Sequence, residues 1–190
     1  PMNHTEALNA SDSHSAQLCK SAGVQEAAHA GGMYFATLYD KDGNIKWQDT
    51  IENLVTTVGG NFGLDTILAG SAYTAAPVIG LKGVGTAVIA DTQASHASWS
   101  EVGGANAPVY SGSRKTPAWS AAASKQKSTS SAVSFAFSSP GTVAGCFLNL
   151  AGSATVDNTT GTLYSAGDFT GGNKTVAASD VLNVTYIASI

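Results

Sequence analysis

Apolar and polar side chains alternate over residues 45–52, and this is the clearest local pattern in the first half of the chain. Ile45, Trp47 and Ile51 fall on one face, while the intervening positions are mostly charged or hydrophilic. A period of two over eight residues is typical of a strand with one buried face. We therefore predict a half-buried β-strand here, with its three apolar residues facing inward.

A second strand is predicted just before it, over residues 33–39. The intervening sequence Asp-Lys-Asp-Gly-Asn at 40–44 offers Gly and Asn for the positive backbone φ angles of a tight turn. The two strands should therefore form a hairpin.

The last third of the chain repeats the alternating pattern. Apolar residues occupy positions 133, 135 and 137, and again 182, 184 and 186. Between them, a turn is expected at Pro140-Gly141, followed by one mostly apolar, buried strand over residues 142–150. Gly-containing turns are expected at 159–161 and 171–173.

The middle of the chain is less regular. Apolar residues at 62, 64, 67 and 68 have helical spacing and predict a short helix over 61–68, and an apolar run predicts a strand over 77–82. Residues 90–109 are rich in Gly, Asn, Ser and Pro, so we expect a long loop, with a turn of helix near 92–97.

Short strands separated by Gly, Pro and Asn turns indicate a mainly β fold. We expect an antiparallel β-sandwich or jelly-roll-like body over residues 33–190. Residues 1–32 contain no aromatic residue and few large aliphatic ones, with short helical pieces expected at 5–9 and 15–28. We interpret this segment as an extended, partly helical N-terminal arm that becomes ordered on binding.

Charge narrows the range of partners. Charged residues make up only 12% of the chain, the net charge is −4, and Arg114 is the single arginine. Nucleic-acid binding requires clustered cations, so no nucleic-acid partner is expected. No apolar run approaches the roughly 20 residues of a membrane-spanning helix, so no membrane association is expected either. Uncharged small residues instead suit surfaces that pack against other subunits.

Two groups of residues resemble parts of known metal sites. Asp40, Asp42 and Asn44 have the spacing that starts a calcium loop, but Ile45 and Ile51 stand where an EF-hand needs Gly and Glu. A hairpin turn is the better explanation, and a loose surface cation site is the alternative. His4, His14 and His29 are too widely spaced for a common ligand motif, so no metal residue is assigned.

Enzymatic signatures are weak. Asp91, His96 and Ser98 are the residue types of a catalytic triad, yet closeness in sequence does not assemble one, and no GxSxG pattern is present. The glycines at 80, 83 and 85 lack phosphate-binding spacing. We assign no catalytic residue and no cofactor, and expect the protein not to be an enzyme.

The cysteines and aromatic residues leave alternatives open. Cys146 lies in an apolar run and is expected to be a reduced core thiol, with a disulfide to Cys19 as the alternative. Trp99, Tyr110 and Trp119 are expected to pack in the core or an interface, although each could instead stack on sugar rings.

Several segments together resemble the small virion proteins of tailed bacteriophages. They are residues 39–47 and 52–59, and the later runs 69–76, 94–101 and 160–169. The resemblance covers about residues 33–190 and implies a virion structural protein, located in the particle, with no catalytic residues to carry over.

Within such a particle we favour a capsid decoration or cement protein. Its partners would be the major capsid protein or neighbouring virion subunits, and it would form a homo-oligomer. The alternative is a tail-associated fibre, adaptor or receptor-binding module that recognises host surface glycan.

Overall fold

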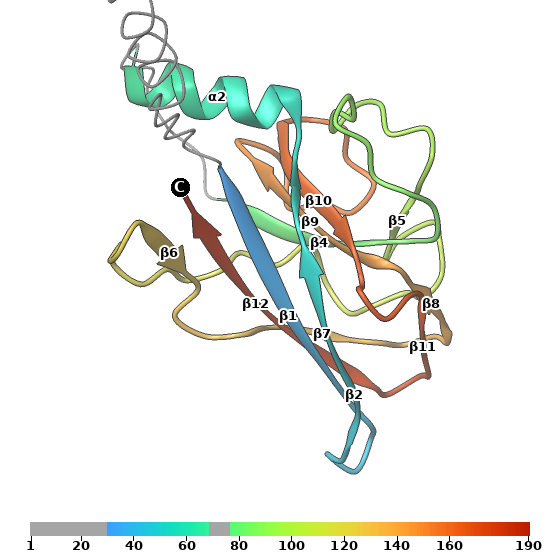
Figure 1. Ribbon diagram of the computed structural model, residues 1–190. Coiled ribbons are helices and arrows are strands. Elements are labelled where there is room, and N and C mark those ends of the chain that lie inside the picture. Colours follow the sequence, from blue (N-terminus) through green and yellow to red (C-terminus); the bar gives the residue numbers. More distant parts are fainter. Residues whose placement is uncertain (1–29, 69–76) are drawn as a thin grey trace, which may run out of the picture.

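The computed structural model of the protein describes residues 30–68 and 77–190 (Figure 1). Of the sequence-based expectations, residues 1–29 of the partly helical arm, with its three histidines and Cys19, lie outside the described residues, whereas Gly31 and Gly32, which were assigned to the arm, belong to the first strand of the body. The elements are β1 (Gly31–Tyr39), β2 (Ile45–Glu52), β3 (Leu54–Val55), α2 (Thr57–Leu68), β4 (Val78–Lys82), β5 (Glu101–Val102), β6 (Gln126–Ser128), β7 (Val133–Ala136), β8 (Gly141–Val143), β9 (Gly145–Leu150), β10 (Thr162–Asp168), β11 (Lys174–Val176) and β12 (Val181–Ser189).

The strands form two five-stranded sheets and a small two-stranded one. The first sheet has the order β2-β1-β12-β6, with β7 also paired to β12, and the second has the order β3-β10-β9-β4-β5. Every strand pairing among the described residues is antiparallel. The expected mainly β, antiparallel fold is therefore confirmed.

The core lies between the two five-stranded sheets. Alternate residues of β1, β7 and β12 point inward from the first sheet, and β4 and β9 supply the opposite wall. These residues belong to one buried cluster that includes Tyr34, Leu38, Phe135, Leu182, Val184, Ile79, Leu81, Cys146 and Leu148. Side chains from both inner faces thus fill one layer, which is the arrangement of a β-sandwich.

The predicted hairpin is present as β1 and β2. The Asp40 carboxylate closes its turn by accepting hydrogen bonds from the backbone N–H groups of Asp42 (2.9 Å) and Asn44 (2.8 Å). The bond from the Asn44 N–H is the main cause holding the pKa of Asp40 below its ordinary value. One detail was wrong: Ile51 is buried, but Ile45, the first residue of β2 after the hairpin turn, is exposed.

The predicted short helix is α2, which begins four residues earlier than expected, at Thr57. Thr56 caps it, because the Gly59 N–H donates to the Thr56 hydroxyl at 3.1 Å. A Cβ at Gly59 would lie 2.3 Å from the Tyr164 carbonyl oxygen, so only glycine lets the helix pack this closely on β10.

The single strand expected over 142–150 is wrong. The chain divides at Ala144 into β8, which pairs with β11, and β9, which pairs with β4 and β10. The Ala144 N–H donates to the Lys82 carbonyl and its carbonyl accepts from the Phe169 N–H, both at 2.8 Å. Because both backbone groups of Ala144 bond to Lys82 and Phe169, Ala144 does not continue the pairing of β8 with β11, and the strand is interrupted there.

The turn of helix expected near 92–97 is also absent. Thr92 and Ser95 instead form a tight antiparallel bridge, and the Ser95 N–H also donates to the Thr92 hydroxyl at 3.0 Å. Local side-chain bonds of this kind compete with helix formation.

Phe135 provides a direct test of the core. Its side chain is 0% exposed, whereas Phe35, on the outward face of β1, is 40% exposed. We expect Phe135→Ala to lower the free energy of unfolding by about 3–5 kcal/mol, because it leaves a cavity between the sheets. The measurement is urea denaturation followed by tryptophan fluorescence.

Phe35→Ala is the matched control and should cost about 1 kcal/mol or less. Similar losses in both variants would contradict the assignment of inner and outer faces.

Candidate functional site

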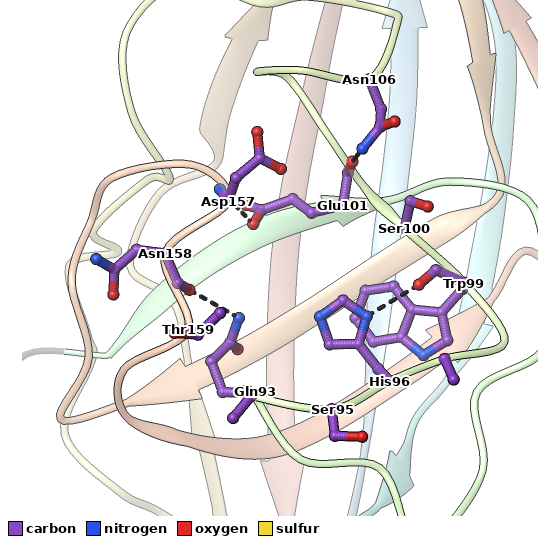
Figure 2. Close-up of a pocket in the computed structure, with 12 residues that line it drawn as sticks. Gln93, Ser95, His96, Trp99, Ser100, Glu101, Asn106, Asp157, Asn158 and Thr159 are labelled. Carbon is purple, nitrogen blue, oxygen red and sulfur yellow. Dashed lines mark hydrogen bonds between the residues drawn. The ribbon is translucent and has the colours of Figure 1, made fainter.

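Two loops at one end of the sandwich enclose a polar groove of about 500 Å³ (Figure 2). Residues 93–101 form one wall, residues 157–159 form the other, and Asn106 lies at one end. The lining consists mainly of amide, hydroxyl and carboxyl groups, together with one imidazole and one indole ring. This groove is the main candidate for a functional site among the described residues.

A buried ion pair fixes the position of both walls. The Arg114 guanidinium donates from Nε to Glu101 Oε1 (2.8 Å) and from Nη2 to Glu101 Oε2 (2.7 Å), with side chains only 0% and 3% exposed. Arg114 also donates to the backbone carbonyls of Ser153 (2.9 Å) and Asn158 (2.7 Å). The Asp157 N–H in turn donates to Glu101 Oε2 at 2.9 Å. The pair therefore attaches the 157–159 loop to β5.

His96 and Trp99 form an aromatic stack in the other wall. Their ring centroids are 3.9 Å apart with an interplanar angle of 17°. His96 Nδ1 lies 2.9 Å from the Trp99 carbonyl oxygen, so the ring is fixed by a hydrogen bond as well as by stacking. In Figure 2 the imidazole lies over the indole. The half-buried imidazole therefore forms the accessible face of this stack.

The structure does not assemble a catalytic triad from Asp91, His96 and Ser98. The Asp91 carboxylate accepts from the Trp99 indole N–H (2.8 Å) and from the Val88 N–H (2.9 Å). The Ser98 hydroxyl donates to the Thr86 carbonyl at 2.7 Å. Each of the three side chains is thus used to hold the loop in shape.

Gln93 is the most constrained polar residue of the groove. Its side chain is 2% exposed, and its Nε2 donates to the Asn158 carbonyl at 3.3 Å. A carbonyl can only accept, so the amide nitrogen must face Asn158 and the amide oxygen must point the other way. That oxygen is buried and has no hydrogen-bond partner among the described residues. A buried amide oxygen without a partner costs about 1–3 kcal/mol.

The glycines of the 80–85 segment serve close packing. A Cβ at Gly80 would lie 2.2 Å from the Phe147 ring, and Gly85, at φ +120°, approaches the Ser98 carbonyl. The neighbouring Lys82 ammonium is buried and donates to the carbonyls of Gly83 and Gly85 and to the Asp168 carboxylate. The segment therefore packs closely against the loop that contains Ser98.

Two of the three aromatic residues singled out in the sequence lie in the interior. Trp99 and Tyr110 are buried, and Tyr110 packs edge-on against Phe135. Trp119 is partly buried and packs against the core. Cys146 is a free, buried core thiol, as expected, and desolvation raises its pKa.

Trp119 also lines a smaller, apolar groove of about 270 Å³ with Leu148, Leu150 and Tyr186. Its indole N–H has no partner among the described residues. This groove is mostly apolar and contains few groups that could orient a ligand.

No described residues form a metal site of three or more His, Cys, Asp or Glu side chains. Within residues 30–68 and 77–190, no helix is long and apolar enough to span a membrane. No family model, curated protein or solved structure matches the chain.

His96 and Trp99 were recognisable candidates in the sequence, whereas the ion pair, Gln93 and the 157–159 loop were not. Of these features, only the ion pair had a recognisable sign in the sequence, because Arg114 is the single arginine of the chain. In a chain with a single arginine, an interior role for its bidentate guanidinium was worth considering.

The ion pair yields a stability prediction. Glu101→Gln keeps the shape of the side chain but leaves the Arg114 charge buried without a carboxylate. We expect the free energy of unfolding to fall by about 3–5 kcal/mol in chemical denaturation.

Asp42→Asn is the control, because its ion pair with Lys41 has side chains that are 62% and 71% exposed. The control should change stability by less than about 1 kcal/mol. An equally small loss in Glu101→Gln would show that the buried pair does not hold this end of the fold together.

Proposed function

We propose that the protein is a structural subunit of a bacteriophage particle, most specifically a capsid decoration or cement protein that bridges major capsid subunits. The proposal begins from the resemblance of residues 33–190 to small virion proteins and from the low charge of the chain. Its partners are neighbouring virion subunits and further copies of itself.

The observation that carries the proposal is the outward face of α2. Leu64, Ile67 and Leu68 are 57%, 73% and 79% exposed. Their spacing places them on one side of the helix, away from β10. An apolar helix face exposed on a body this well packed favours burial against another subunit.

The outer face of the first sheet offers a second, flatter surface. One row across its strands consists of Gln48, Thr37, Asn183 and Ser134. Gln48 donates to Thr37 at 3.2 Å, and Ser134 donates to Asn183 at 2.6 Å. Covering such uncharged groups removes no ionised side chain from water, so the desolvation cost is low.

A tail-associated position within the particle is the second candidate, and the polar groove is the observation that favours it. A fibre head or adaptor that contacts the host needs a recognition site, and the groove has suitable size and polarity. Both candidates are virion structural proteins, and they differ only in their location on the particle.

Electron cryo-microscopy of the intact particle is the decisive experiment. We expect density for this fold in regular copies at the junctions between capsid subunits. Density restricted to the tail would replace the cement assignment by the tail-associated one, and its absence from purified particles would refute both.

The α2 surface is tested by the double variant Ile67→Glu, Leu68→Glu. Both side chains are largely exposed, so the body should stay folded, while two buried carboxylates would oppose docking. We expect incorporation into particles, measured by quantitative mass spectrometry of purified particles, to fall about tenfold or more.

Ile45→Glu is the matched control. Ile45 is 56% exposed at the β1–β2 hairpin, which lies at the opposite end of the sandwich from α2 (Figure 1). Equal incorporation of the α2 variant and the control would contradict docking through α2.

A further inference from the structure

We infer that the polar groove between residues 93–101 and 157–159 binds a neutral carbohydrate. This inference deepens the recognition role that the tail-associated candidate gives to the groove, because it names the class of ligand, and its test does not depend on where the protein sits on the particle. Three properties of the groove support it: its charge, its hydrogen-bonding groups and its aromatic face.

Charge excludes anionic ligands. No lysine or arginine lines the groove. The nearest guanidinium, that of Arg114, is 0% exposed, and all three of its nitrogens donate to protein oxygens. Phosphate and carboxylate ligands would lie beside the carboxyl groups of Asp157 and Glu101 with no lysine or arginine in the lining to offset their charge. A ligand for this groove must therefore be uncharged or cationic.

The hydrogen-bonding groups suit hydroxyls. Gln93 Oε1 is a buried acceptor without a described partner, and its orientation is fixed by the bond from Nε2 to Asn158. The exposed Asp157 carboxylate uses Oδ2 to accept from the Ala105 N–H at 2.8 Å, which leaves Oδ1 as a second acceptor. Thr159 adds a hydroxyl at the rim. A sugar ring carries several O–H groups that can donate and accept among these positions.

The aromatic face suits a sugar ring. The His96 imidazole is held flat on Trp99 by stacking and by its bond to the Trp99 carbonyl. Small-molecule sites combine apolar or aromatic walls with a few placed polar groups. The apolar side of a pyranose can lie on the imidazole while its hydroxyls bond to Asp157 Oδ1 and the Thr159 hydroxyl at the rim.

An extended peptide fits less well. Peptides bind by adding a strand to a free sheet edge or by inserting apolar side chains into pockets. Here most lining residues come from loops, and apart from the His96–Trp99 stack their side chains are small or polar.

The test is an array of neutral hexose and N-acetylhexosamine oligosaccharides, with sialylated and phosphorylated glycans beside them. The full chain should bind members of the neutral set only. For the best soluble oligosaccharide, isothermal titration calorimetry should show that His96→Ala weakens binding about tenfold, because the imidazole surface under the sugar ring is removed. Thr159→Phe, which fills the groove from an exposed position, should weaken binding at least as much.

Thr175→Phe, at an exposed position on β11, is the matched control and should bind as the unaltered protein does. Circular dichroism would establish that each variant is folded. The inference is overturned if no neutral glycan binds at millimolar concentration, if only acidic glycans bind, or if both groove variants keep full affinity. It is also overturned if the groove selects peptides from a random displayed library and no glycan.

Discussion

Burying the Glu101 carboxylate together with the Arg114 guanidinium constrains three parts of the chain at once. The pair joins β5 to the segment at 114, and through the carbonyls of Ser153 and Asn158 it holds the loop that leads to β10. Charged groups taken out of water are tolerated only when their hydrogen-bonding capacity is met, and here it is met almost entirely by partners distant in sequence. The groove walls consequently have a defined separation although, apart from Glu101 in β5, their residues belong to loops.

The sequence predicted those elements whose signals are local. Alternation over residues 45–52 and at positions 182, 184 and 186 corresponds to β2 and β12, and the Asp-Gly-Asn turn between β1 and β2 is present. Alternation of apolar and polar residues indicates which face of a strand is buried, and Gly, Asn and Asp residues indicate where the chain turns. The mainly β, antiparallel class followed from these signals because most of the core comes from such strands.

The remaining features depend on contacts between distant segments. The division between β8 and β9 at Ala144 is caused by Lys82 and Phe169, which bind its backbone groups from other parts of the fold. Neither the exposure of Ile45 nor the partner of Arg114 has a local signature. The groove itself was not predicted: His96 was noted only as part of a possible triad and Trp99 as a core or interface residue, and the contact of Gln93 with Asn158 in the 157–159 loop joins segments that are far apart in sequence.

Low charge gives the proposed function and the proposed ligand a common physical basis. Another subunit can cover the row formed by Gln48, Thr37, Asn183 and Ser134 without a large desolvation cost. A groove with no lysine or arginine in its lining selects its ligand by the positions of the ligand's hydroxyl groups. Single sites of this kind bind weakly, because neutral hydrogen bonds replace bonds to water at little net gain. A particle that displays many copies compensates, since linked sites raise avidity by orders of magnitude without any new contact. A neutral recognition groove is therefore most useful on a protein that is presented in an array, which is the setting that the α2 surface and the sheet face favour.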